Sequence, residues 1–429
     1  MIPGYRPRTV DDELRARLGA SGAVVIEGPK ACGKTATARQ IAASEVLLDV
    51  DANARRAIAV DPSLVLDGAV PRLVDEWQIE PVIWNHVRRA VDDRAAPGQF
   101  ILTGSAVPAD DITRHTGAGR ISRLRMRPMS LFESGRGTGE VSLAQLLAGE
   151  APRSIDPGLG LADLAREVAV GGWPGSRELA PDAALRAVRD YLEEIRRTDI
   201  DRVDGTRRDP DKVGRLLRSL ARNVATTATV TTLAGDAAGT DGSLKRDTVS
   251  DYLSALGRLM IVEEQPAWAP HLRSRCILRG AAKRHFVDPS LAVAALRATP
   301  EDLLRDLELL GLLFESLVVR DLRVYAQAPD AQVLHYRDSS GWRSTPSFAA
   351  RTGDGQRSRS SSEPVRSTTA PPASTASPGR STPSGVAARA RWASSPAAAT
   401  GTCAGTVSRS FRSVPYVREK ARSAHLASA

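Results

Sequence analysis

The residues best suited to chemistry lie in one short segment, Gly-Pro-Lys-Ala-Cys-Gly-Lys-Thr-Ala, in which two glycines bound a loop. The spacing G-x4-G-K-T predicts a loop whose backbone N–H groups turn inward to bind phosphate. Lys34 is expected to reach the β- and γ-phosphates of ATP, and the Thr35 hydroxyl to bind Mg²⁺. The alternative is an ordinary glycine-rich turn. The expected nucleotide-binding residues are Gly28, Pro29, Lys30, Ala31, Cys32, Gly33, Lys34, Thr35 and Ala36.

A strand and a helix must hold this loop in place. Val24, Val25 and Ile26 precede the loop and have the continuous apolar character of a buried strand. The residues from Lys34 onward, which begin Lys-Thr-Ala-Thr-Ala, favour a helix whose positive amino end points at the bound anion. The order of strand, loop and helix therefore predicts the phosphate-binding corner of an α/β fold.

Two adjacent acids later in the chain predict hydrolysis of the nucleotide. Asp75, at the end of an apolar approach, is expected to hold the water shell of Mg²⁺, and Glu76 to orient and deprotonate an attacking water. Another predicted strand, residues 99–105, ends in polar residues, of which Thr103 and Ser105 are candidate sensors of the γ-phosphate. The alternatives are a solvated turn at the two acids and a plain β-turn after the strand.

Charge and cysteine usage exclude several classes of protein. The net charge is +9, but residues 341–429 hold 13 basic and 3 acidic residues, which leaves 46 basic and 47 acidic residues in 1–340. Any DNA-binding argument must therefore rest on a local patch rather than on the overall charge. Three cysteines lie far apart without metal-like spacing, and no apolar run is long enough for a membrane span. We expect a cytoplasmic protein without membrane contact.

The middle of the chain has the pattern of a winged helix-turn-helix. Three predicted helices, 212–224, 231–238 and 243–259, precede a hairpin that begins at residue 260. In the third helix Ser243 is the expected cap, and the exposed side chains are expected to include Lys245, Arg246, Ser250 and Tyr252. Lys245 and Arg246 could contact DNA. The alternative is a lid on the nucleotide site or a contact with an unknown protein partner.

Four segments together resemble a known family: Glu27–Thr35, Leu73–Gln78, Phe100–Ala106 and the stretch from Gly119 to Glu133. They are similar to the prokaryotic AAA-type P-loop ATPases that carry a C-terminal domain of unknown function of the 4143 type, over about 340 residues. The resemblance implies that the first three segments are the Walker A, Walker B and sensor 1 motifs. It makes Arg120 a candidate to act on the γ-phosphate, in cis or from a neighbouring subunit of an oligomer. A structural salt bridge is the alternative for Arg120.

The composition changes abruptly after residue 340. Residues 341–429 contain no Ile, no Met and one Leu, and are dominated by Ser, Thr, Ala, Pro, Gly and Arg. Such a segment cannot bury enough apolar surface to offset its ordering entropy, so we expect a disordered basic tail. Back-translation of residues 342–362 permits a shifted reading frame with Glu-Val-Asp and Glu-Val-Lys. Because the family continues with these nuclease-like motifs, a frameshift is favoured over an evolved tail.

These observations predict three parts. Residues 1–150 form an AAA-like α/β P-loop NTPase domain with a parallel sheet and flanking helices, 151–340 a helical and winged-helix domain with a truncated nuclease-like end, and 341–429 the tail. The predicted function is that of a Mg²⁺-dependent ATPase that acts as a switch or motor. The alternative is a nucleotide-binding DNA or protein adaptor with negligible turnover.

Overall fold

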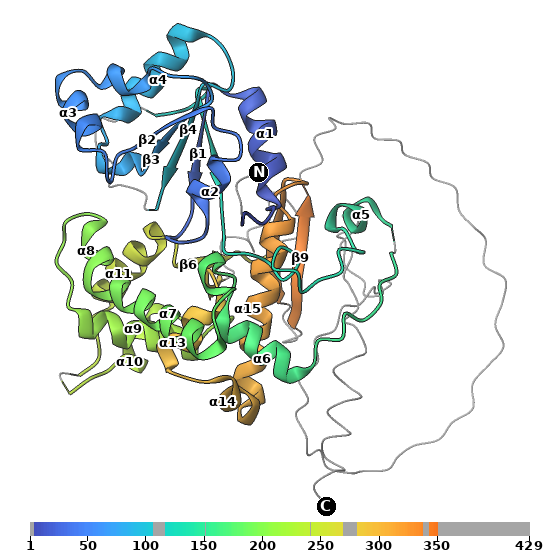
Figure 1. Cartoon of the computed structure of the whole chain (residues 1–429). Helices are drawn as coiled ribbons and strands as arrows, with labels where there is room; N and C mark the ends of the chain where they lie inside the picture. Colours follow the sequence, from blue (N-terminus) through green and yellow to red (C-terminus); the bar gives the residue numbers. More distant parts are fainter. Residues whose placement is uncertain are drawn as a thin grey trace, which may run out of the picture.

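The computed structural model describes residues 4–105, 116–150, 152–240, 242–268, 281–337 and 343–350. A unit built on a parallel sheet lies beside a helical unit (Figure 1). Within the described residues, no helix combines the length and apolar character needed to cross a membrane. The cytoplasmic location stays a prediction.

The amino-terminal unit is a five-stranded parallel sheet in the order β2-β3-β4-β1-β5. The central strands are apolar on both faces, as expected for strands covered by helices on two sides. Because all five strands run the same way, the loops that follow β1, β3 and β4 meet at one edge of the sheet. The strands are β1 (Ala23–Glu27), β2 (Ser44–Leu47), β3 (Arg72–Asp75), β4 (Phe100–Gly104) and β5 (Ile121–Arg125).

Helices cover both faces of this sheet and create two apolar cores. Helix α1 precedes the first strand, and its Leu14 and Leu18 are buried with Val24 and Ile26 of β1. On the other face α3 and α4 pack against Val25. The described helical segments of this unit are α1 (Val10–Ala20), α2 (Lys34–Ala38), α3 (Ala52–Val60), α4 (Ile83–Arg94) and the 3₁₀ segments η1 (Pro62–Leu66) and η2 (Trp77–Ile79).

The second unit is mainly helical and has one large apolar core and a smaller apolar cluster around Leu143, Ala326 and Val333. Trp173 is buried in the large core, with its ring centroid 4.7 Å from that of Tyr191. The elements are α5 (Leu143–Ala148), α6 (Leu161–Val170), η3 (Pro174–Ser176), α7 (Pro181–Glu194), the π-helical η4 (Ile195–Asp199), α8 (Ile200–Arg202), α9 (Pro210–Arg222), α10 (Val230–Asp236), α11 (Arg246–Arg258), β6 (Val262–Gln265), β7 (Lys283–Phe286), α13 (Pro289–Leu296), α14 (Pro300–Arg305) and α15 (Leu307–Tyr325).

The three predicted helices and the hairpin occur in the expected order as α9, α10, α11 and the antiparallel pair β6-β7. Two details differ from expectation. Helix α11 begins at Arg246 after Lys245, so Ser243 is not its cap, because Leu244 turns into the core just before the helix. Tyr252 is 5% exposed rather than solvent-facing, because it continues the apolar stripe of Val249 and Leu256. That these helices and the strand pair form a winged helix stays a prediction.

A buried carboxylate joins the two units. Glu263 of β6 accepts hydrogen bonds from Arg125 at the end of β5, from Arg127 and from Arg323 of α15, at 3.0, 3.0 and 2.6 Å. Burial alone would raise the pKa of Glu263, but the three guanidinium groups hold it well below its ordinary value. This ion cluster connects the far end of β5 to the second core.

The fold extends beyond the predicted start of the tail. Strand β8 (Ala331–Arg337) pairs antiparallel with β9 (Arg343–Ala350), with Tyr336 opposite Ser344. This corrects the expectation of an unstructured chain from residue 341. The composition argument concerned side-chain burial, whereas a strand pair is formed by backbone hydrogen bonds. The rest of the predicted tail, residues 351–429, lies outside the described residues.

Candidate functional site: a phosphate pocket between β1, β3 and β4

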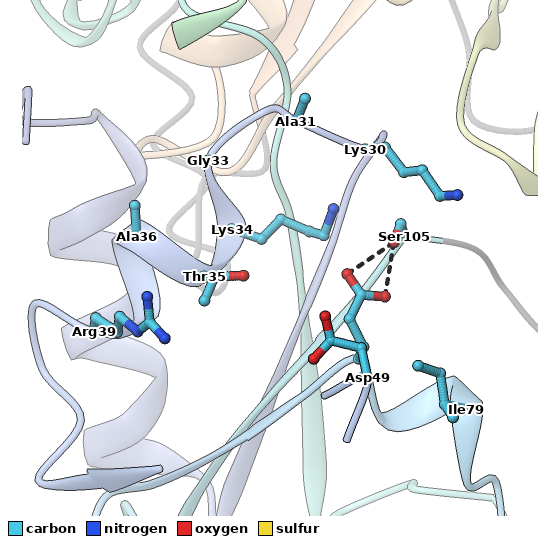
Figure 2. Close-up of a pocket in the computed structure, with 11 residues that line it drawn as sticks. Lys30, Ala31, Gly33, Lys34, Thr35, Ala36, Arg39, Asp49, Ile79 and Ser105 are labelled. Atoms are coloured by element: carbon cyan, nitrogen blue, oxygen red, sulfur yellow. Dashed lines mark hydrogen bonds between the residues drawn. The ribbon is translucent and has the colours of Figure 1, made fainter. Parts of the chain in front are cut away.

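The predicted phosphate loop joins β1 to α2 and lines a pocket of about 580 Å³ at the carboxyl edge of the sheet (Figure 2). The loop and α2 contribute most of the lining, and the loops after β2, β3 and β4 complete it. The lining residues are Lys30, Ala31, Gly33, Lys34, Thr35, Ala36, Arg39, Asp49, Glu76, Ile79 and Ser105. The structure thus brings together residues that lie as far apart in the sequence as 30 and 105.

Both glycines of the loop are required by its shape. A Cβ atom at Gly28 would stand 2.3 Å from the backbone oxygen of Met126, which follows β5. Gly33 has a φ of +105°, a conformation that side chains disfavour. The tight packing of Gly28 and the left-handed turn at Gly33 give the loop its curvature just before α2.

The ammonium group of Lys34 is held over the loop. Its side chain is buried, and Nζ donates hydrogen bonds to the carbonyl oxygens of Gly28 at 3.0 Å and Pro29 at 2.9 Å. A lysine ammonium has three donors, so it can bind a phosphate oxygen from this position. Figure 2 shows Lys34 and Lys30 extending from the loop toward the side of the pocket where Ser105 lies.

Hydrogen bonds join the side chains of Thr35 and Thr103 to that of Asp75, next to the pocket. The Thr35 hydroxyl donates to Asp75 Oδ1 at 2.9 Å, and the Thr103 hydroxyl donates to the same oxygen. Hydroxyl and carboxylate oxygens are ligands suited to Mg²⁺, which commonly takes one or two carboxylates together with phosphate oxygens and waters. The pair therefore fits the predicted metal site. Within the described part of the chain no cluster of three or more His, Cys, Asp or Glu could hold a metal by itself.

Glu76 turns from the end of β3 into the pocket. Its φ of +53° is in the left-handed region, which is uncommon for a residue with a side chain, and its N–H donates to Thr103 Oγ1 at 3.2 Å. The carboxylate accepts hydrogen bonds from Ser105 at 2.9 and 3.1 Å, drawn as dashed lines in Figure 2, and from the Gln78 amide. These contacts fix a carboxylate beside the phosphate loop.

The two predicted sensor residues, at the end of β4, have different surroundings. β4 lies between β1 and β3, so its end reaches both the phosphate loop and the two acids. Thr103 is fully buried and contacts Asp75, whereas Ser105 lines the pocket and contacts Glu76. Of the two, Ser105 is thus the residue that lines the pocket, and Thr103 is the residue that contacts both Asp75 and the Glu76 N–H.

The structure does not bring Arg120 to the pocket. It comes directly before β5, beside the start of β1, and therefore lies at the edge of the sheet opposite the phosphate loop. Its Nε donates to Asp92 at 2.8 Å, and this bond lowers the pKa of the Asp92 carboxyl. The arrangement matches the structural salt bridge that was the alternative for Arg120, and only its role from a neighbouring subunit stays a prediction.

Sequence reasoning missed several pocket residues. Asp49 lies two residues after the end of β2, and an acid just beyond an apolar strand could have identified it as a pocket residue. Arg39 comes one turn after Thr35 on the same side of α2, and pairs with Glu45 at 2.6 Å. By contrast, Asp199 of the second unit, which binds Lys30, lies too far away in sequence for any local pattern to reveal it.

Comparisons with known proteins agree with this geometry. Residues 20–134 match the family model of an AAA domain, and residues 161–302 match that of a domain of unknown function, DUF8612. The amino-terminal unit, which has a parallel α/β fold, is thus similar to an AAA domain. The predicted 4143-type second domain is not confirmed, because the model of a different domain matches there.

The solved structures that resemble this chain are distant. The Walker-type ATPase of Pyrococcus abyssi has a TM-score of 0.42 at 12% identity, over 68% of this chain and 98% of that chain. Drosophila ORC bound to DNA has a TM-score of 0.19 at 14% identity, over 70% of this chain and 89% of that chain. At these TM-scores neither likeness carries an argument. No curated protein matches the chain.

Proposed function

We propose that the chain is a Mg²⁺-dependent ATPase that uses ATP binding and hydrolysis as a switch or motor for its second unit. The observation that supports this most directly is the position of Glu76. A carboxylate held by Ser105 at the edge of the phosphate pocket is what activation of a water molecule requires. A protein that only binds the nucleotide would need the phosphate loop but not Glu76.

The proposal gives distinct roles to the phosphate loop, the metal ligands, the base and Ser105. The loop N–H groups and Lys34 bind the phosphates, while Thr35 and Asp75 would hold Mg²⁺, which supplies positive charge that stabilises the phosphoryl group as it is transferred. Glu76 orients the attacking water and accepts its proton. Ser105 keeps the Glu76 carboxylate in place and faces the terminal phosphate.

A second candidate function is a nucleotide-binding adaptor with negligible turnover. It is favoured by the contacts of Glu76, whose carboxylate is engaged by both Ser105 and Gln78. A carboxylate that stays hydrogen-bonded to two neighbours has fewer lone pairs left to bind an attacking water. Measured phosphate release distinguishes the two candidates.

We further propose that α11 is the surface that contacts DNA or an unknown protein partner. Lys245 and Arg246 are exposed at its amino end, as expected for phosphate contacts. Asp247 and Asp251 are exposed on the same helix, so the surface carries both signs of charge. Weak and salt-sensitive DNA binding fits such a surface better than tight binding.

The experiment that tests the proposed function is nucleotide binding by the full chain and by Lys34→Ala. With Mg²⁺ and a fluorescent ATP analogue, we expect Lys34→Ala to weaken binding by about a hundredfold, the scale of lost hydrogen bonds to a charged group. Lys212→Ala, at a partly exposed position of α9, is the control and is expected to bind like the parent. Equal binding by Lys34→Ala and the parent would contradict the proposal.

A further inference from the structure

One residue of the phosphate loop is held by the second unit. Lys30 Nζ lies 2.6 Å from Asp199 Oδ1, and the carbonyl oxygen of Lys30 accepts a hydrogen bond from the Tyr191 hydroxyl at 3.3 Å. Lys30 also lines the phosphate pocket. The same lysine is thus placed between a carboxylate of the second unit and the space where the nucleotide phosphates would lie.

The two ends of this ion pair differ in their environment. The Lys30 side chain is 48% exposed, whereas the Asp199 side chain is 8% exposed. Within the described residues, the Asp199 carboxylate pairs with the Lys30 ammonium group. A buried carboxylate that loses its cation is strongly unfavourable unless water reaches it. Removal of Lys30 from Asp199 would therefore favour a shift of Asp199 toward solvent.

Asp199 lies at a point where such a shift is structurally accessible. It ends the π-helical turn η4, which interrupts the run from α7 to α8, and irregular turns of this kind are frequent at functional sites. Another ion pair, Arg39–Glu45, has one member, Arg39, in the lining of the same pocket but lies entirely within the first unit. Among the residues that the structure describes, the Lys30–Asp199 pair is the one ion pair that connects the phosphate loop to the second unit.

A second set of contacts continues from Asp199 to α11. The buried Arg208 donates to the Ile200 carbonyl oxygen at 2.8 Å and makes two hydrogen bonds of 3.0 Å to Asp251 on α11. Its backbone N–H also donates to Asp201 at 2.9 Å. Because Arg208 holds α8 and α11 together, a displacement of residues 199–201 is transmitted to α11.

We propose that Lys30 exchanges between Asp199 and the terminal phosphate of a nucleoside triphosphate, so that the ion pair is a latch that nucleotide binding opens. This inference rests on the proposed function and identifies how the site regulates the second unit. A triphosphate opens the latch and a diphosphate leaves it closed, because only the terminal phosphate competes with Asp199. Opening releases α8 and, through Arg208, alters α11.

The test measures binding of a non-hydrolysable Mg·ATP analogue and of Mg·ADP to the full chain. In Asp199→Asn, Lys30 is free in advance, so the analogue should bind about fivefold more tightly than to the parent, the scale of one partly exposed ion pair. ADP affinity should change less. In a Lys30→Gln background the Asp199→Asn change should have no effect on analogue binding. Unchanged or weaker analogue binding by Asp199→Asn would overturn the proposal.

Hydrogen exchange supplies an independent readout. In the parent, the analogue should increase amide exchange in residues 246–258, and ADP should not. Glu45→Gln, which breaks the matched pair of the first unit, should keep this response, whereas Lys30→Gln should show high exchange without nucleotide. Because Lys30 is half-exposed, Lys30→Gln also tests the latch if Asp199→Asn does not fold. The proposal would be overturned if amide exchange in residues 246–258 were the same with and without nucleotide and the same in Lys30→Gln as in the parent.

These outcomes separate the latch from the proposed function. If the parent binds the analogue and Lys34→Ala does not, but Asp199→Asn behaves like the parent, the latch is wrong and the nucleotide site stands. If the parent binds neither the analogue nor ADP, both are wrong.

Discussion

Ser105 Oγ lies 2.9 and 3.1 Å from the two carboxylate oxygens of Glu76, across neighbouring strands of the parallel sheet. The pair links the end of β4 to the end of β3 in the lining of the phosphate pocket. A base for water activation must be held in one orientation, and this hydroxyl supplies that restraint. The relationship therefore predicts a measurable role for a residue that does not itself accept the proton.

We expect Ser105→Ala to reduce kcat for ATP hydrolysis by about tenfold or more, the scale at which supporting hydrogen bonds affect active-site groups. Nucleotide affinity should change little, because the loop and Lys34 remain. Steady-state phosphate release and analogue binding measure the two effects. Ser122→Ala, a small hydroxyl residue on β5 outside the pocket, is the matched control. Loss of affinity with unchanged kcat would contradict this role.

Neutralising Lys245 and Arg246 together is expected to weaken DNA binding in a salt-dependent way. Removal of two phosphate contacts should lower the slope of log affinity against log salt by about 1.8 for duplex DNA. The full chain is used for both proteins, so that the basic residues after 340 contribute equally. Neutralising Arg15 and Arg305, two exposed arginines of α1 and α14, is the control. An unchanged slope in the Lys245 and Arg246 variant would exclude α11 as a DNA contact.

The buried His285 makes stability depend on pH. Burial, followed by the charges of Arg323 and Lys283, lowers its pKa well below the ordinary value of 6.5. The folded chain keeps His285 neutral, so below about pH 6.5 the unfolded chain binds a proton that the folded chain does not. Stability is therefore full above that pH and decreases as the pH falls, by up to about 1.4 kcal/mol per pH unit.

Thermal unfolding between pH 7.5 and 5 measures this dependence. His285→Gln can keep hydrogen bonds to Ser316 and Gln265, and its Tm should fall less over this range than the parent's. His86→Gln, at a partly exposed position of α4, is expected to follow the parent. Parallel curves for His285→Gln and the parent would show that His285 does not set the dependence.

The sequence was most informative where function depends on local pattern. The phosphate loop needs residues 28–36 to be contiguous, and Asp75 and Glu76 end one strand, so both could be predicted before any fold was known. Glycine spacing and strand ends also predicted the α/β class. Ser105 could be named for the same reason, although only the pairing of β4 with β3 shows that it contacts Glu76.

The remaining features depend on long-range packing. The Lys30–Asp199 and Arg125–Glu263 pairs join residues more than 130 positions apart, which no local periodicity encodes. The exposure of Tyr252 was predicted wrongly because a tyrosine at the border of an apolar stripe can face either way until its neighbours are placed. Arg120 was linked to the nucleotide by family resemblance, but parallel pairing of β5 with β1 puts it at the opposite edge.

The origin of the composition change after residue 340 can be tested by reading the gene. If residues 342–362 come from a shifted frame, the alternative frame should run open through this region and encode Glu-Val-Asp followed by Glu-Val-Lys. In that case, strand β9 lies where the alternative frame would encode Glu-Val-Asp, and it pairs with β8 through its backbone. Stop codons scattered through the alternative frame would reject the frameshift.

The measurement that tests the central claim most directly is phosphate release by the parent and by Glu76→Gln, together with their affinities for a Mg·ATP analogue. Glutamine keeps the size of the side chain and can still interact with Ser105, but it cannot accept a proton from water. We predict a kcat lower by about 10²- to 10⁴-fold, the contribution of a general base, with analogue affinity close to that of the parent. Hydrolysis by Glu76→Gln at the parent's rate would contradict the assignment of Glu76 as the base.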